Sequence, residues 1–345
     1  MLSVLLTVVG LGLLIAAHEA GHLVLARLMG MRVETYSLGF GPRIWGFTRG
    51  GTDYRLSALP LGGYCKIAGF TPDEPAAQDP NDNGAYMNKP VWRRALVIFA
   101  GPGVNYLSAF LIIFVLYVTH GFPNLATDRI EVVPGGPAAA AGLATGDQVT
   151  AVDGTPISGF EGLRHELQKG GAPAERRIDV VRSGEKRTFV VHPASNNTIS
   201  VGAERVLLRL GPGEALSRAA QDVWTLNAGT LGALWDVVRF KGGANIGGPI
   251  AIVQQASQEV KRGLADFASI LANISVGLAV FNLLPVPALD GGRLVFLAGE
   301  LVTRRKANPR FEQVVNVAGM LFLLALLLSV VVFNDLGLAK KLFHH

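Results

Sequence analysis

The sequence Ala16-Ala17-His18-Glu19-Ala20-Gly21-His22 closes an apolar run that begins at Met1, and it decides how the rest of the chain is organised. Residues four apart lie on one face of a helix, about 5–6 Å apart at Cβ, so His18 and His22 can hold one metal ion. Glu19 lies at the edge of that face, where it can reach a water molecule on the metal. Two neutral imidazoles suit zinc and leave room for one more protein ligand. The alternative is a chance match, in which the three polar side chains only line a helix bundle.

The composition indicates a membrane protein. Half of the 345 residues are hydrophobic and only 17% are charged, which departs from the balance of a soluble domain. Four apolar windows are long enough for four transmembrane helices. These windows are Met1–Ala26, Ala95–Thr127, Phe267–Leu289 and Val314–Phe333. No Lys or Arg precedes Arg27, so the first window lacks the basic start of a signal peptide and we expect it to stay in the chain.

The charges between the windows predict an orientation. The stretches after the first and third windows are rich in Lys and Arg, whereas the tail after the fourth carries only Lys340 and Lys341. Because basic residues beside spans stay on the cytoplasmic side, we expect both termini and the segment 121–266 on the opposite side. The segment Lys89–Arg94, with Trp92 among basic residues, is predicted to anchor the second span at the membrane interface. The net charge of +5 therefore requires no nucleic-acid partner, and the single cysteine, Cys65, excludes an intramolecular disulfide framework.

The segment Val33–Phe70 alternates short apolar runs with Gly and Pro, which is typical of strands and turns. We expect a membrane-associated β-hairpin region there, since non-helical backbone at membrane depth must be covered by protein or water. An exposed edge can bind an unwound peptide by strand pairing, and a purely structural hairpin is the alternative. The candidate substrate-binding residues of this region are Leu61, Gly62, Gly63 and Tyr64.

The segment Asp128–Leu210 is predicted to be a separate α+β module. Pro-Gly-Gly-Pro at 134–137 and Val-Asp-Gly at 152–154 belong to a pattern that resembles a bacterial PDZ domain. Such domains bind extended peptide ends by strand addition. A spacer that only blocks access sterically is the alternative. Ser158 and Glu161 predict a capping box at the start of a helix.

The second half of the predicted metal site is the run Asn282-Leu283-Leu284-Pro285-Val286-Pro287-Ala288-Leu289-Asp290. Pro285 and Pro287 each lack an N–H and restrict the residue before them, so the third span must break there. Unwound backbone at this depth needs protein or a wet cavity beside it. We therefore predict Asp290 as the third zinc ligand, with Asn282, Pro285 and Pro287 as further substrate-binding candidates. An aspartate that merely caps the next helix is the alternative.

Together these motifs make the chain similar to the site-2 protease family, and most of all to the bacterial regulator-of-sigma-E type. Further matching segments are Phe-Gly-Pro at 40–42, Pro-Leu-Gly-Gly-Tyr at 60–64, Ala-Gly-Pro-x-x-Asn at 100–105 and Gly-Gly-Pro-Ile at 247–250. The resemblance implies zinc on His18, His22 and Asp290, with Glu19 as the general base. It also implies cleavage of a membrane-spanning helix that another protease has already shortened. One departure is the single PDZ-like module, where the best-known members of this type carry two.

We therefore expect an α-helical membrane protein with about four transmembrane helices, a membrane-associated β-hairpin region and one inserted PDZ-like α+β domain. The predicted segments are 1–30 (first span), 31–94 (cytoplasmic-side loop with a re-entrant β region), 95–120 (second span), 125–210 (PDZ-like domain), 211–264 (amphipathic and connecting helices), 265–292 (third span), 293–313 (cytoplasmic loop) and 314–335 (fourth span).

The expected function is intramembrane zinc proteolysis, and the expected cofactor is Zn²⁺. The expected partners are the lipid bilayer and a pre-cleaved single-span membrane protein, for example an anti-sigma factor, or signal-peptide remnants. The expected location is the bacterial inner membrane, with the termini and the PDZ-like domain on the periplasmic side. Two other classes stay open: a zinc transporter, which would carry metal across the membrane, and a scaffold that binds membrane proteins without cutting them.

Overall fold

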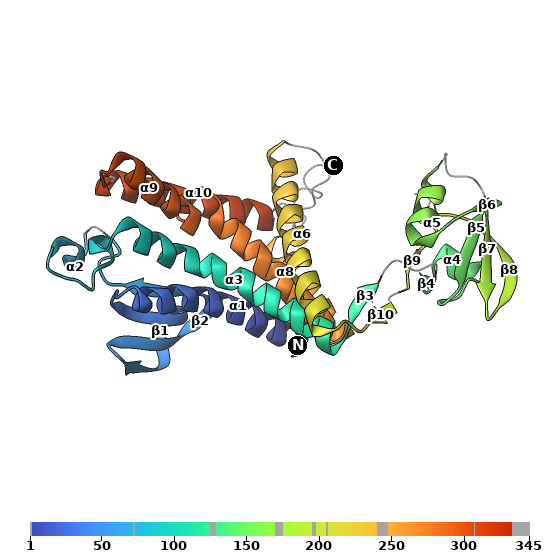
Figure 1. Cartoon of the computed structure of the whole chain (residues 1–345), viewed down its shortest axis with the longest axis horizontal. Coiled ribbons are helices and arrows are strands. Elements are labelled where there is room, and N and C mark those ends of the chain that lie inside the picture. Colours follow the sequence, from blue (N-terminus) through green and yellow to red (C-terminus); the bar gives the residue numbers. More distant parts are fainter. Residues whose placement is uncertain are drawn as a thin grey trace. The chain divides into compact units, whose positions relative to one another are not determined.

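The computed structural model describes residues 2–71, 73–124, 129–169, 175–194, 198–204, 206–239, 248–306 and 308–332. They form two compact units (Figure 1). The first unit takes in the chain up to and including Leu116 and from Leu216 onward, and the second is Tyr117–Ala215. Parts of several predicted segments, including Gly247, Lys340, Lys341 and the end of the fourth span, lie outside the described residues.

Within the described residues, four helices are long and apolar enough to cross a membrane. They are α1 (Leu2–Leu28), α3 (Val91–Thr119), α8 (Leu264–Leu283) and α10 (Pro309–Val330). A helix satisfies its backbone polar groups internally, which is what a span in lipid requires. On α10 large apolar side chains such as Phe322 and Leu324 are exposed, as expected of a lipid-facing surface. Each of these helices overlaps one of the four apolar windows predicted as spans.

Five further helices of the described residues lie wholly or mostly in the first unit. They are α2 (Pro75–Gln78), η1 (Tyr86–Asn88), α6 (Pro212–Val238), α7 (Pro249–Arg262) and α9 (Asp290–Thr303). Helix α7 packs against α1 and α8, with its Ser257 hydroxyl 3.1 Å from the Thr7 hydroxyl. On α6, Asn227 Oδ1 accepts a hydrogen bond of 2.6 Å from the Tyr106 hydroxyl of α3.

Two long strands, β1 (Val33–Arg49) and β2 (Thr52–Ile67), pair into a two-stranded antiparallel sheet that lies along α1 (Figure 1). The register shifts repeatedly, so that Val33–Leu38 has partners on two sides, Gly63–Ile67 and Asp53–Leu56. The Tyr36 hydroxyl donates a hydrogen bond of 2.7 Å to the Ala16 carbonyl of α1. This contact fixes the sheet against the turn of α1 that carries the histidines.

One core joins the sheet to the helices. Its buried members come from α1, β1, β2, α3, α9 and the intervening turns: Leu23, Ala26, Met31, Val33, Ile67, Tyr86, Val97, Ile98 and Leu297. Because apolar packing tolerates little change in volume, this core holds α1, α3 and α9 at a fixed separation.

The third span breaks where the two prolines predict. Helix α8 ends at Leu283 and α9 begins at Asp290. The break packs tightly against the start of α9, because a Cβ at Gly291 would collide with the Leu283 and Leu284 carbonyls. Leu289, not Asp290, occupies the N-cap position of α9, so Asp290 is free for another role.

The second unit contains a four-stranded antiparallel sheet in the order β6-β5-β7-β8. These strands are Thr155–Pro156, Gln148–Val152, Arg176–Arg182 and Glu185–Val191. Two strand pairs, β3 (Phe122–Asn124) with β10 (Val206–Leu208) and β4 (Ile130–Val132) with β9 (Val201–Ala203), and two helices, α4 (Pro137–Ala140) and α5 (Gly159–Gln168), complete it. Its own core includes Val152, Leu163, Ile178 and Val180. Ser158 precedes α5 as predicted, but its side chain makes no capping hydrogen bond.

Candidate metal centre

Three predicted ligands converge although they come from helices far apart in the sequence. His18 and His22 on α1 are each 8% exposed, and their Nε2 atoms lie 3.3 Å apart. Asp290 Oδ2, at the start of α9, lies 3.3 Å from His18 Nε2 and 3.5 Å from His22 Nε2. One ligand atom from each residue therefore lies within 4.8 Å of the other two. This is the spacing of atoms that share one ion.

The backbone of α3 sets the proton position on His22. Its Nδ1 lies 2.8 Å from the Val97 carbonyl oxygen. A carbonyl only accepts hydrogen bonds, so Nδ1 carries the proton and donates it. In the neutral ring Nε2 then presents a lone pair toward Asp290 and His18, as a metal ligand must.

His18 also has a hydrogen-bond partner on α3, the side chain of Asn105. The Asn105 amide nitrogen lies 3.1 Å from His18 Nδ1, and Asn105 Oδ1 is buried with no hydrogen-bond partner among the described residues. Turning the amide by 180° exchanges the two atoms. Asn105 Oδ1 then accepts the His18 Nδ1 proton, which leaves Nε2 of His18 free to bind metal and satisfies the amide oxygen.

Gly101 lets α3 approach the two rings. A Cβ at this position would collide with His22 Nε2 and lie 2.7 Å from His18 Cε1. A spacing of four residues places Val97, Gly101 and Asn105 on one face of α3. This face contacts both imidazoles through the Val97 carbonyl and the Asn105 amide, and Gly101 leaves the space that the rings occupy.

The donor set fits zinc. Asp290 Oδ2 is buried and has no hydrogen-bond donor in the described part of the chain. Its nearest polar neighbours are two imidazole nitrogens, and two imidazoles with one carboxylate are an established three-ligand set of catalytic zinc sites. An orphaned buried oxygen is costly, and a bound cation would remove that cost.

Glu19 shares a cavity with the three ligands. The cavity, about 360 Å³ in volume, is also lined by Tyr64, Asn282 and Arg293. The other substrate-binding candidates lie outside this lining. Leu61, Gly62 and Gly63 belong to β2, and Pro285 and Pro287 form the break between α8 and α9.

From the sequence, Gly101 and Asn105 were included only as part of a segment that matches the family pattern, and Val97 was not singled out. The four-residue spacing of Ala-Gly-Pro-x-x-Asn was the available signal, since it places Gly101 and Asn105 on one helical face. The Val97 contribution is a backbone carbonyl, which leaves no trace in residue type.

Residues 6–326 match the model of peptidase family M50. The chain belongs to this family. Relatives named as candidate zinc metalloproteases span nearly the whole chain. One from Rhizobium meliloti is 33% identical, covering 95% of this chain and 94% of its own length. Another from Agrobacterium fabrum is 31% identical, covering 95% and 93%, and one from Clostridium perfringens is 31% identical, covering 92% and 94%.

Membership of family M50 confirms the resemblance to the site-2 proteases. The protein is a zinc metalloprotease with several membrane-spanning helices, and zinc is its cofactor. Membership of a peptidase family argues against the two alternative functions, a zinc transporter and a scaffold that binds membrane proteins without cutting them.

Proposed function

We propose that the protein hydrolyses a peptide bond within a transmembrane helix of another membrane protein, with zinc held by His18, His22 and Asp290. The observation that carries this proposal is the convergence of the three ligand atoms. Two of them lie on α1, a helix apolar enough to cross the bilayer, and the third follows the break after α8, another such helix. Ionisable groups at membrane depth are costly and therefore imply a functional use.

The residues around the site have separate tasks. When bound there, zinc polarises the scissile carbonyl and lowers the pKa of water. Glu19 accepts the proton of the attacking water and passes it to the leaving amine, as a general base and then a general acid. The Val97 carbonyl and Asn105 hold the imidazoles in the tautomer that leaves each Nε2 lone pair facing inward.

The substrate must unwind before cleavage, because every peptide group of a helix is already hydrogen-bonded. The segment Gly63–Ile67 of β2 pairs with Val33–Leu38 on one side, and no strand pairs with its other side in the described part of the chain. We propose that this edge, which includes Tyr64, binds the extended substrate by strand pairing. Leu61 and Gly62 would extend this edge, Asn282 would hydrogen-bond the extended peptide, and Pro285 and Pro287 would keep the facing backbone unwound. Unchanged cleavage of a strongly helical substrate by Asn282→Ala would refute the Asn282 role.

The substrate class is a single-span membrane protein already shortened outside the membrane by another protease. An anti-sigma factor or a signal-peptide remnant has this form. We propose that the second unit is a PDZ-like module that binds new peptide ends or excludes bulky proteins. Its small antiparallel sheet with two helices and its own core is compatible with such a module.

We place the protein in a bacterial inner membrane, with the β1–β2 sheet associated with the bilayer as a hairpin region. The exposed Ile44, Trp45 and Phe47 of β1 support contact with lipid. The excess of Lys and Arg after α1 and after α8 supports a cytoplasmic location for these stretches. Both termini and the PDZ-like unit would then be periplasmic.

The test is co-expression of a tagged, pre-truncated single-span substrate with the wild type or with Glu19→Gln. We expect the variant to keep its zinc and to lose about 10²–10⁴-fold in cleavage rate, because the proton acceptor is gone. Asn282→Ala serves as a second variant that should keep zinc. Equal cleavage by wild type and Glu19→Gln would contradict the proposal.

A further inference from the structure

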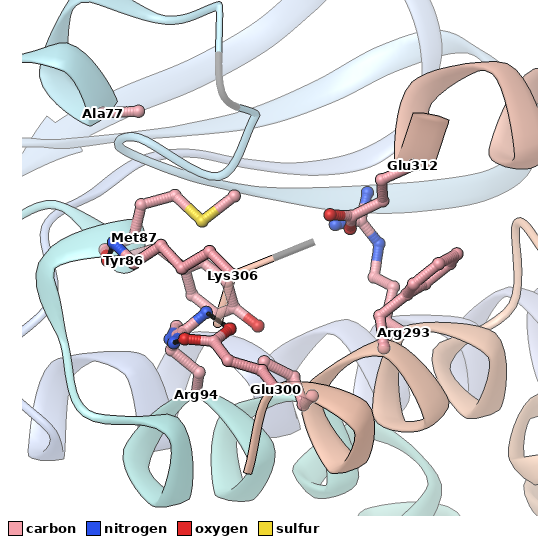
Figure 2. A pocket seen from close by; sticks show the side chains of 10 residues that line it. Ala77, Tyr86, Met87, Arg94, Arg293, Glu300, Lys306 and Glu312 are labelled. Carbon is pink, nitrogen blue, oxygen red and sulfur yellow. Dashed lines mark hydrogen bonds and ion pairs between the residues drawn. The ribbon is translucent and has the colours of Figure 1, made fainter. Parts of the chain in front are cut away.

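A buried ion pair joins α9 to α3 beside a second cavity of about 200 Å³. Figure 2 shows Arg94 and Glu300 pointing toward one another. Arg94 Nη1 lies 3.0 Å from Glu300 Oε2, and Nη2 lies 2.5 Å from Oε1. The Arg94 Nε donates to the Lys89 carbonyl at 3.0 Å. The side chains are only 4% and 13% exposed, so both are fixed in one geometry.

Stability alone does not account for this pair. Removing two charges from water costs about as much as their attraction returns, and apolar residues of the same volume often serve as well. The bidentate pair fixes the orientation of the two side chains, because its hydrogen bonds are directional whereas apolar contacts are not. The neighbouring Leu297 contact fills space without fixing the rotation of α9.

On the α3 side, Arg94 lies one helical turn before the groups that hold the histidines. The Val97 carbonyl accepts from His22, and Gly101 and Asn105 follow on the same face. A group attached to this turn of α3 is therefore attached to the frame of both imidazoles.

On the α9 side, Glu300 lies ten residues after Asp290 in the same helix, or about 15 Å along its axis. A hydrogen-bonded helix turns as one body, so fixing the direction of Glu300 also fixes the direction of Asp290. Past the end of α9, Lys306 Nζ donates to the Met87 carbonyl at 3.0 Å, which ties the same end of the helix to η1.

We propose that Arg94 and Glu300 are positioning residues, whose ion pair fixes the rotation of α9 against α3 so that the Asp290 carboxylate faces His18 and His22. This inference rests on the proposed zinc site. It predicts that the pair governs zinc affinity although neither residue touches the ion.

The experiment measures zinc affinity and thermal unfolding of the full-length protein in detergent, with a chromophoric chelator competing for zinc. Glu300→Gln keeps the shape of the side chain but removes its charge. We expect its zinc affinity to fall about 10–100-fold, the range typical of residues that orient metal ligands. Arg94→Met with Glu300→Leu replaces the pair by apolar side chains, which should keep the melting temperature within about 3 °C of the wild type while zinc affinity stays reduced.

Two further variants make the result specific. Asp147→Asn breaks the ion pair with Arg182 in the second unit and should leave zinc affinity unchanged, because α9 and the proposed ligands belong to the first unit. His18→Ala removes a proposed ligand and should reduce zinc affinity more than either variant of the Arg94–Glu300 pair.

Wild-type zinc affinity in the double variant would overturn the positioning role, even if Glu300→Gln fails to fold. Zinc affinity that falls only in step with melting temperature would also overturn it, since that result describes a purely structural pair. If His18→Ala binds zinc normally, the proposed zinc site itself is wrong. This failure differs from a failure of the positioning role, in which His18→Ala loses zinc but the Arg94–Glu300 variants do not.

Discussion

Two aspartates, Asp147 buried in the second unit and Asp290 partly exposed in the first, are surrounded in opposite ways. Asp147 in the second unit has a side chain that is 1% exposed. Its Oδ1 accepts from Arg182 Nε at 2.6 Å, and its Oδ2 accepts from Arg182 Nη2 at 2.7 Å and from the Ala144 N–H at 2.9 Å. Asp290 is 16% exposed, and its Oδ2 faces two imidazole nitrogens at 3.3 and 3.5 Å.

The difference separates a structural carboxylate from the one proposed to bind zinc. Asp147 meets hydrogen-bond donors on both oxygens, so its charge is compensated within the chain and stabilises the fold. Asp290 meets two nitrogens whose lone pairs point inward, which stabilises nothing until a cation binds. The two share a residue type but differ in exposure, 1% for Asp147 and 16% for Asp290, and the character of the neighbours separates them most clearly.

The largest effect should come from Asp290→Ala. Removing this ligand should lower zinc affinity by more than about 100-fold, because even residues that only orient a ligand are worth 10–100-fold. Zinc content after dialysis against a chelator measures this. Asp147→Asn is the matched control and should retain zinc like the wild type. Equal zinc loss in both variants would erase the distinction between the two aspartates.

A second prediction concerns Asn105, which holds His18 rather than the metal. Asn105→Ala should lower zinc affinity about 10–100-fold, since His18 loses the partner that fixes its tautomer. Asn227→Ala is the control, because it removes a hydrogen bond to the adjacent Tyr106 of α3 without touching a histidine. Both affinities can be measured by chelator competition, and unchanged binding in Asn105→Ala would refute the tautomer argument.

A third prediction sharpens the other side of the comparison. Asp147→Asn should make the amides of β5 and β7 exchange hydrogen on the order of tenfold faster, because a charged hydrogen-bonded acceptor is lost. Exchange in α1 should not change. Hydrogen exchange followed by mass spectrometry on the full chain reports both. Faster exchange in α1 would mean that the effect of the substitution is not confined to the second unit.

The smallest effect is a pH dependence of the second unit. Burial by itself would raise the pKa of Asp147, but hydrogen bonds from Arg182 and Ala144 outweigh it and hold that pKa below its ordinary value. The pKa of Asp153 is likewise lowered against the effect of burial, by hydrogen bonds from Arg176 and the Arg177 N–H.

A lowered pKa in the folded state means that the stabilisation is complete above the unfolded value of about 4 and is lost as pH falls through the folded value. We therefore expect lower protection factors in β5 at pH 3 than at pH 6. Asp147→Asn should show a smaller difference between the two pH values. An equal difference in the variant would assign the effect to other groups.

The sequence predicts the parts of this site that depend on local rules. His18 and His22 follow from helical spacing, and the break before Asp290 follows from two prolines. Asp290 was predicted as the third ligand from its place on this break, and the family resemblance implies the same set, although no local rule joins residues 18 and 290.

What sequence reasoning missed depends on non-local pairing. Arg94 was predicted to lie at the membrane interface, yet it is buried. Its ion pair with Glu300 compensates the buried charge, and Glu300 lies 206 residues later in the sequence. Asp147 was not singled out from the sequence, and its contribution to the fold depends on Arg182, 35 residues later. In both cases the residue type indicates a charge, but its oppositely charged partner is known only from the fold.

The central claim is that His18, His22 and Asp290 hold one zinc ion, and zinc X-ray absorption spectroscopy on the full-length protein tests it most directly. The account predicts about one zinc per chain with two imidazole nitrogens and a carboxylate oxygen at about 2.0–2.2 Å, and loss of this spectrum in Asp290→Ala but not in Asp147→Asn. A spectrum that Asp290→Ala leaves unchanged would contradict it.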